Sequence, residues 1–389
     1  MMKPSMMPVF QIATASSLVV LGDTLLYTIL PSYYVHFGLA PYQVGLLLSV
    51  NRWIRLGTNY ASAYAERLYP SQLWLLGSLF LGAVVTAIYG TIEAFIILLG
   101  ARIVWGVCYS FIRQAGIMTA LHVGDQAHAG KRMGYLRGTA SLWQGIGVLL
   151  GGLSHDLFGF STTLVTLSII ALAAVPLGSL SQRKIRCVDH PAPRFQLGEG
   201  NVGLPLCGFS IGVVGSGLIM STLGLILKER FGDSLHVVGY TVGTVTLTGT
   251  ILSGRWILDA VGLPSLGAAA DSMERGRSIV FLFAIGGAAM LSAALLKDPL
   301  CLVLVVLACF VCGETLNMLL STQAARLGPK NLASYVIALD LGSSLGPSFG
   351  WGLVQFGLPA YFIFFLAGVF YMLSTILSYR VIYKSLVQS

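Results

Sequence analysis

Long apolar runs separated by short polar stretches make up most of this chain. Each run is continuous, rich in Leu, Ala and Gly, and about 20 to 25 residues long, which is the length that an α-helix needs to cross a bilayer. The runs lack the alternating pattern of membrane β-strands. We therefore predict helices at residues 9–33, 42–66, 71–91, 94–122, 134–157, 161–181, 204–227, 238–260, 279–296, 299–325, 332–354 and 359–382. The pattern indicates an all-α integral membrane protein with twelve transmembrane helices.

The longest polar interruption divides these helices into two sets of six. Residues 183–203 carry four basic side chains and two prolines and show no hydrophobic periodicity. We interpret this stretch as a cytoplasmic linker. The predicted organisation is an N-terminal six-helix bundle over 1–182, the linker over 183–203, and a C-terminal six-helix bundle over 204–389.

The two halves show traces of an internal repeat, which favours pseudo-symmetric bundles. Phe37-Gly38 and Val44-Gly45 recur as Phe231-Gly232 and Val238-Gly239, both at an offset of 194 residues. Arg52-Trp53-Ile54 recurs as Arg255-Trp256-Ile257 at an offset of 203. Either the eighth helix carries about nine extra residues, or the tripeptide match is chance.

Composition and charge placement support a membrane location. Only 10% of residues are charged and the mean hydropathy is +0.81, whereas about a quarter of the residues of a soluble domain are charged. With the N-terminus inside, fifteen basic residues fall in inner loops and only Lys228, Arg230 and Lys297 fall in outer loops. This bias predicts cytoplasmic termini in a plasma membrane, specifically a bacterial inner membrane. It also explains the net charge of +8 without a nucleic-acid partner.

Two loop motifs and one helix motif point to a family. After the second predicted helix, Glu66 and Arg67 take the acidic and basic positions of a Gly-x-x-x-Asp-Arg-x-Gly-Arg loop, and Asp271 and Arg277 belong to a similar loop in the second half. Arg102 begins an Arg-bearing motif in the fourth helix. With the six-plus-six organisation, these features resemble the major facilitator superfamily of secondary transporters, in particular its drug and metabolite exporters. The resemblance implies a monomer that moves a small solute by alternating access.

The resemblance also implies roles for the loop charges and for glycines at helical spacing. Glu66, Arg67, Asp271 and Arg277 are expected to act as gating loops, with ordinary surface charge as the alternative. The glycine positions are Gly147 and Gly151 in the fifth helix and Gly342, Gly346 and Gly350 in the eleventh. Glycines four apart allow close helix packing, which rocking bundles require. Plain tight packing is the alternative.

Ionisable residues inside the predicted helices are the clearest functional signal. They are Asp23, Arg52, Arg55, Arg102, Arg113, Arg255, Asp259, Glu314 and Asp340. A charge at mid-membrane costs about 3 kcal/mol or more, so such side chains are expected to face water or one another. The family fold lines its cavity with helices 1, 2, 4, 5, 7, 8, 10 and 11, and all these residues fall on that set.

Their signs suggest separate roles in a substrate and proton pathway that comprises Asp23, Arg52, Arg55, Arg113, Glu314 and Asp340. Arginine stays charged and binds carboxylates with two hydrogen bonds, so Arg52 and Arg113 are the expected anchors for an anionic or polar group. Burial disfavours the charged form of a carboxyl group, so Glu314 or Asp340 is expected to carry a proton. The alternative is that these groups neutralise one another in structural pairs, such as Asp23 with Arg52.

We therefore predict a proton-coupled secondary transporter that exports a small organic solute. An uptake symporter or uniporter for an organic anion is the alternative within transport. A non-transporting receptor or assembly factor on the same scaffold is the alternative of another class. The sequence contains no phosphate-binding loop and no clustered metal ligands, so we expect no cofactor, no metal and no enzymatic activity.

Overall fold

The computed structural model describes residues 6–68, 71–123, 128–182, 202–237, 240–272 and 275–380. The predicted linker lies outside these ranges except for its last two residues. The side chains of Glu66, Arg67 and Asp271 also lie outside the description. By its packing the chain divides into two units. The first unit contains Met1–Ile29 and Val50–Arg194, and the second contains Leu30–Ser49 and Phe195–Ser389.

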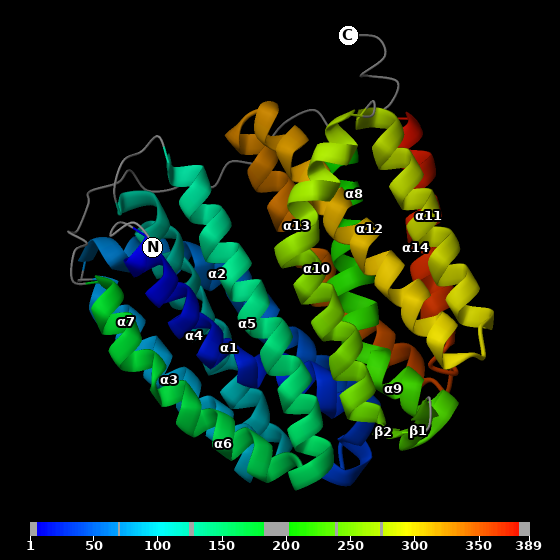
Figure 1. Cartoon of the computed structure of the whole chain (residues 1–389), viewed down its shortest axis with the longest axis horizontal. Coiled ribbons are helices and arrows are strands. Elements are labelled where there is room, and N and C mark those ends of the chain that lie inside the picture. The colour runs from blue at the N-terminus through cyan, green and yellow to red at the C-terminus, as the bar shows by residue number, and fades with distance from the viewer. Residues whose placement is uncertain are drawn as a thin grey trace. The chain divides into compact units, whose positions relative to one another are not determined.

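The first unit is built from helices that follow one another through short connections. They are α1 (Met7–Tyr33), α2 (Pro41–Leu68), α3 (Ser71–Thr91), α4 (Phe95–His122), α5 (Ala129–Phe158), α6 (Phe160–Leu172) and α7 (Ala174–Gln182). The last few residues of α1 and the first nine of α2 belong to the second unit. Helices α6 and α7 form one span that is interrupted at Ala173. Figure 1 shows this span running along α3.

The second unit contains the remaining helices and one short hairpin. Its elements are the 3-10 helix η1 (Tyr34–Phe37), α8 (Gly203–Ile211), η3 (Gly212–Ile219), α9 (Met220–Phe231), β1 (Ser234–Val237), β2 (Tyr240–Gly243), α10 (Thr244–Ser272), α11 (Arg275–Leu295), α12 (Pro299–Arg326), α13 (Pro329–Gln355) and α14 (Phe362–Ser378). Elements α8, η3 and α9 form one continuous span whose middle is a π-helix. In Figure 1, α11 lies beside α14.

The described residues therefore form twelve helical spans, which confirms the predicted fold class. The predicted bounds agree with the structure to within about five residues, except for the eighth span. That span was predicted at 238–260, but α10 covers Thr244–Ser272. The residues before it form an antiparallel hairpin, in which β1 pairs with β2. The sequence analysis missed this hairpin because it placed β1 in the preceding loop and read the residues of β2 as part of the following apolar run.

The hairpin explains the two offsets of the internal repeat. Helix α2 begins three residues after Gly38, whereas α10 begins twelve residues after Gly232, so the nine extra residues precede the helix. Both glycines have positive φ, 61° and 80°, at the end of a helical segment. Arg52 and Arg255 are each the twelfth residue of their helix. The tripeptide match is therefore structural, and the Val-Gly match is coincidental.

Residues 30–49 group with the later helices because they pack on α13. A Cβ added at Gly45 would lie 3.1 Å from the carbonyl oxygen of Pro347. The backbone N–H of Ser348 donates to Ser49 Oγ at 3.1 Å, and Tyr34 meets Trp351 edge to face at 5.1 Å. The sequence analysis did not predict this grouping.

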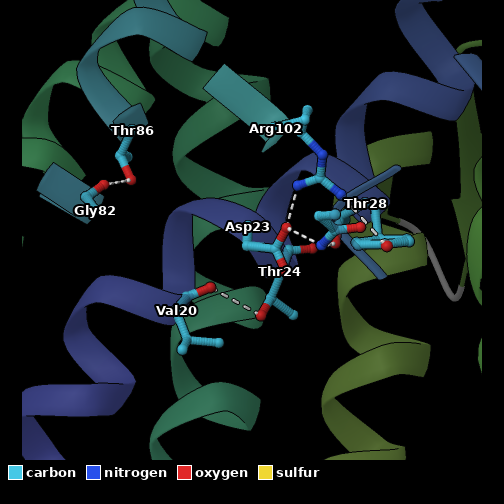
Figure 2. Close-up of polar contacts among 9 residues, drawn as sticks. Val20, Asp23, Thr24, Thr28, Gly82, Thr86 and Arg102 are labelled. Carbon is cyan, nitrogen blue, oxygen red and sulfur yellow. Dashed lines mark hydrogen bonds and ion pairs between the residues drawn. The ribbon is translucent and has the colours of Figure 1, made fainter. Parts of the chain in front are cut away.

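Many serine and threonine hydroxyl groups within the helices form a local hydrogen bond, as a bilayer favours. Thr24 Oγ1 donates to the Val20 carbonyl at 3.0 Å, and Thr86 Oγ1 donates to the Gly82 carbonyl at 3.0 Å (Figure 2). Such bonds to the carbonyl four residues earlier leave no hydroxyl exposed to lipid. Serine and threonine can therefore occur in these spans at little cost.

Charged side chains stabilise several helix ends. Arg132 donates to the carbonyls of Ala120 and Leu121 at the C-terminus of α4, at 2.6 and 3.2 Å. Arg230 donates to the carbonyls of Ala293 and Ala294 at the C-terminus of α11, at 3.0 and 2.8 Å. Cations at this end satisfy free carbonyls and oppose the helix dipole. Arg132 and Arg230 therefore satisfy carbonyl groups at two helix ends, in addition to any part that their charges play in membrane orientation.

The N-terminus of α12 carries a side-chain cap. Asp298 precedes the helix, and its carboxylate accepts the backbone N–H of Cys301 at 2.8 Å. That hydrogen bond lowers the pKa of the Asp298 carboxyl group. Pro299 takes the first helical position, where no backbone N–H is needed. This cap fixes the start of the helix that carries Glu314.

Candidate functional site

The first unit contains a buried ion pair between α1 and α4. Asp23 and Arg102 point toward one another and form a salt bridge (Figure 2). Arg102 is 1% exposed and Asp23 is 15% exposed. Asn51 Nδ2 donates to the same Asp23 oxygen at 3.4 Å, and Arg102 donates to the Tyr27 hydroxyl at 3.4 Å. The carboxylate is thus held by two helices besides its own.

Arg52 lies close to this pair on α2. Its guanidinium carbon is 5.0 Å from the centroid of the Tyr27 ring. Tyr27 also lies 5.6 Å from the guanidinium of Arg102. One aromatic ring therefore contacts two arginines, and cation–π attraction offsets part of the cost of placing them there.

Arg55 lies on α2 about one helical turn after Arg52. Its guanidinium lies 4.2 Å from the centroid of the Tyr109 ring on α4. Its Nε is buried and has no hydrogen-bond partner. The two helices approach closely here because α4 has Gly106, where a Cβ would lie 2.7 Å from the carbonyl oxygen of Asn51. The sequence thus brings Arg55 against an aromatic ring but gives it no anion.

Arg113 lies further along α4 and is half-buried. No ion pair joins Arg113 or Arg55 to an acidic side chain among the residues that the structure describes. Arg102 is therefore balanced by Asp23, whereas no described acidic side chain pairs with Arg55 or Arg113. We call Arg52, Arg55 and Arg113 the arginine group.

The second unit contains a comparable ion pair between α10 and α12. Arg255 forms a salt bridge with Glu314, and their side chains are 6% and 22% exposed. Arg255 also donates to the sulfur of Met220 at 3.5 Å. Its guanidinium lies 5.0 Å from the centroid of the Phe310 ring, on the turn of α12 before Glu314. The pair is buried on the arginine side and accessible on the carboxylate side.

Asp340 is the other acidic residue that the sequence analysis placed in the pathway. It is half-buried in the middle of α13, and its side chain forms no ion pair among the described residues. Its carbonyl accepts the hydroxyl of Ser344 at 2.6 Å. Among the described residues, Asp340 is thus an acid without a paired cation, whereas Arg55 and Arg113 of the first unit are cations without a paired acid.

Two sets of predicted glycines lie at close helix contacts. A Cβ at Gly342 would lie 2.2 Å from the carbonyl oxygen of Phe209, and one at Gly346 would lie 2.4 Å from the Cα of Gly217. Those contacts join α13 to the α8 and η3 span. At Gly147 and Gly151 of α5 the nearest atoms belong to leucine side chains of α1, and at Gly350 to the Leu218 side chain. Gly342 and Gly346 therefore meet backbone, whereas Gly147, Gly151 and Gly350 meet side chains that can shift.

Of the four predicted gating residues, only Arg277 has a described side chain. Arg277 is exposed at the start of α11, and the side chains of Glu66, Arg67 and Asp271 lie outside the description. Their gating role stays a prediction. Within the described residues, no group of three or more His, Cys, Asp or Glu side chains could hold a metal ion.

The sequence analysis left two central residues out of its predicted pathway. Arg102 and Arg255 were noted as intramembrane charges, but only the structure shows that each neutralises an acid on another helix. The aromatic partners Tyr27 and Tyr109 are two of the sixteen tyrosines in the chain. Only their distance to an arginine distinguishes them, and sequence spacing does not contain that distance.

Comparisons with known proteins bear on this arrangement. Residues 12–200 match the family model of the Major Facilitator Superfamily. No curated protein sequence matches the chain. A POT family transporter solved in complex with 5-aminolevulinic acid aligns with a TM-score of 0.78 at 11% identity, over 97% of this chain and 96% of the other.

Two further structures align over nearly the full length of both chains. The nucleoside transporter NupG gives a TM-score of 0.76 at 11% identity, over 96% of this chain and 100% of the other. The human organic anion transporter MFSD10 (TETRAN) gives 0.68 at 14% identity, over 97% and 100%. At such identities the alignments establish the fold. The family match covers residues 12–200, just under half of the chain, and the chain shares its fold with these transporters over nearly its whole length.

Proposed function

We propose that this protein is a proton-coupled transporter of a small organic anion. In this proposal the arginine group of the first unit binds the anion, and Glu314 of the second unit carries the proton. We keep export as the direction to be tested, because the loop motifs resemble those of drug and metabolite exporters.

The observation that carries the proposal is that Arg55 and Arg113 have no acidic partner among the described residues. Arg55 and Arg113 lie about 10 Å or more from the nearest end of their helices, and no described acidic side chain pairs with either. Arginine does not lose its proton in proteins, so neutralisation must come from another group. An organic carboxylate or phosphate supplies that charge and accepts two hydrogen bonds from one guanidinium.

The polarity of the helices supports an aqueous path beside these residues. Seven described spans are long and apolar enough to cross a membrane on length and composition. The other long helices, α2, α5, α10 and α13, are less apolar. They are the second, fifth, eighth and eleventh spans, and the family fold lines its cavity with these four among others. A helix beside water can carry polar residues that a lipid-facing helix cannot.

Glu314 is the better candidate for the proton than Asp340 because its carboxylate already has a defined partner. Protonation would neutralise Glu314 and weaken its bond to Arg255, so the pair has two arrangements that depend on pH. A ligand shifts a conformational equilibrium only if it binds the two states differently. The Arg255 and Glu314 pair provides such a difference for a proton.

Two of the structurally similar proteins suit this substrate class. One is named as an organic anion transporter, and another was solved with 5-aminolevulinic acid. Because both proteins are distant in sequence from this chain, their names and ligands serve here only to choose compounds for the test. A panel should therefore contain small organic carboxylates and phosphates, each with a neutral analogue of the same size.

The test uses purified protein in liposomes with a pH gradient and a fluorescent proton probe. We expect an anion of the panel, but not its neutral analogue, to trigger proton movement. Glu314→Gln should abolish that movement, and Arg113→Gln or Arg55→Gln should weaken anion binding about tenfold or more, since a hydrogen bond to a charged group contributes about 1.5–3 kcal/mol. Arg326→Gln removes an exposed arginine at the end of α12 and should behave like the native protein.

Two results would count against the proposal. Transport that is unchanged in Glu314→Gln would remove the proton role of that residue. Equal transport of anions and neutral analogues, with no effect of the arginine substitutions, would remove the anion site. Binding without any movement of solute would favour the non-transporting receptor instead.

A further inference from the structure

Tyr371 of α14 has a buried hydroxyl group that no described residue satisfies. Its side chain is 0% exposed, and the hydroxyl has no hydrogen-bond partner. Buried polar side chains are nearly always bonded to protein or to ordered water. The ring itself is well packed, edge to face against Phe283 at 5.5 Å. The hydroxyl therefore lies in a fixed position without a structural bond to explain it.

Two glycines make room for this tyrosine. A Cβ at Gly286 of α11 would lie 2.8 Å from the ring, and a Cβ at Gly313 of α12 would lie 2.9 Å from the hydroxyl oxygen. Gly313 directly precedes Glu314. The missing side chain at Gly313 thus lets the hydroxyl reach α12 at the residue before Glu314. Tyr371 interacts electrostatically with both Glu314 and Arg255.

The ion pair beside Tyr371 also has an unused donor. The Nε of Arg255 is buried without a hydrogen-bond partner. A second tyrosine near Glu314 is different, because the hydroxyl of Tyr335 donates to Asn317 Oδ1 at 2.9 Å. Of these two tyrosines, only Tyr371 keeps its hydroxyl available.

We infer that Tyr371 is a positioning residue for Glu314. Its hydroxyl donates a hydrogen bond, through one water molecule, to the ionised Glu314 carboxylate while that carboxylate is paired with Arg255. A donor to the carboxylate favours the charged form. Tyr371 therefore lowers the pH at which Glu314 takes up its proton. This inference rests on the proposed role of Glu314.

Other titratable groups face the same region and must be kept constant in the test. They are Arg255 and Asp259 of α10, Cys309 and Cys312 of α12, and Tyr335 of α13. Arg255 acts in the same direction as Tyr371, because a cation also favours the carboxylate. The substitution must therefore remove the Tyr371 hydroxyl and leave the ion pair intact.

Tyr371→Phe meets this requirement, because it keeps the ring against Phe283. The measurement is a pH titration of the infrared band of the protonated carboxyl group, with Glu314→Gln subtracted to isolate Glu314, and it needs no substrate. We expect the midpoint to rise by about one pH unit in Tyr371→Phe, since one hydrogen bond to a charged group corresponds to about that shift. Ser374→Ala removes a hydroxyl one turn away that donates to the Phe370 carbonyl at 2.9 Å, and it should leave the midpoint unchanged.

Gly313→Ala gives a second test if Tyr371→Phe does not fold. The added methyl group would displace the hydroxyl, so the midpoint should also rise. An unchanged midpoint in the folded variant would overturn the inference. The proposed function has its own test, because the loss of coupled transport in Glu314→Gln does not depend on Tyr371. If Glu314→Gln abolishes coupling and Tyr371→Phe shifts nothing, only the positioning role fails.

Discussion

At the scale of single residues, the interior of each unit contains one arginine that is almost completely buried against a carboxylate. Arg102 pairs with Asp23 in the first unit, and Arg255 pairs with Glu314 in the second. A buried pair is costly to break because the remaining partner keeps its charge in a medium of low polarity. The pairs are therefore expected to matter for stability as well as for transport.

Asp23→Asn tests the first of these pairs. The change leaves Arg102 charged at 1% exposure, so the free energy of unfolding should fall by about 3–5 kcal/mol. Denaturant unfolding in detergent, followed by tryptophan fluorescence, measures the effect. Asp23→Asn combined with Arg102→Met removes both charges and should recover much of the loss. Equal stability of Asp23→Asn and the native protein would show that the pair does not stabilise the fold.

At the scale of elements, the closest helix contact in the second unit joins α13 to the α8 and η3 span. Gly212 and Gly342 oppose each other there, and each would place a Cβ within about 2.2 Å of a carbonyl oxygen on the other helix. Backbone atoms cannot rotate away as a side chain can. A sequence motif that was interpreted through a family resemblance thus has a direct steric explanation at this contact.

Gly342→Ala is the corresponding prediction. Its Cβ would meet the carbonyl oxygen of Phe209 at 2.2 Å and the backbone nitrogen of Val213 at 2.9 Å, so the helices must separate at a cost of about 1–3 kcal/mol. Gly352→Ala lies on the same helix, where nothing lies within 4 Å of the added Cβ, and it should be neutral. Thermal unfolding of both variants decides the matter, and a Gly342→Ala protein as stable as Gly352→Ala would contradict the steric argument.

At the scale of the whole molecule, the repeat relates α2 to α10 residue by residue. Arg52 and Arg255 take the same position in their helices, but they have different surroundings. Arg255 pairs with Glu314, whereas Arg52 lies over the Tyr27 ring. The two arginines thus occupy the same position in their helices but contact different partners.

The orientation of the chain in its membrane is the prediction at this scale. The excess of basic residues in the loops assigned to the cytoplasm predicts that both termini lie there. Green fluorescent protein fused to either end should fluoresce, and alkaline phosphatase fused to either end should be inactive. A fusion in the turn after α9 should give the opposite pair of results. Active phosphatase at a terminus would overturn the predicted topology.

The sequence alone determined the helices, their number and their approximate ends, because the length and apolarity of a membrane span are local properties of the chain. It also found the charges inside the spans, since a charge in an apolar run is visible without a structure. The tertiary structure decided which arginine neutralises which acid, which described tyrosine hydroxyls were left without a bond, and that residues 234–237 pair with residues 240–243. Those outcomes depend on distances between residues far apart in the chain, and no pattern along one helix contains them.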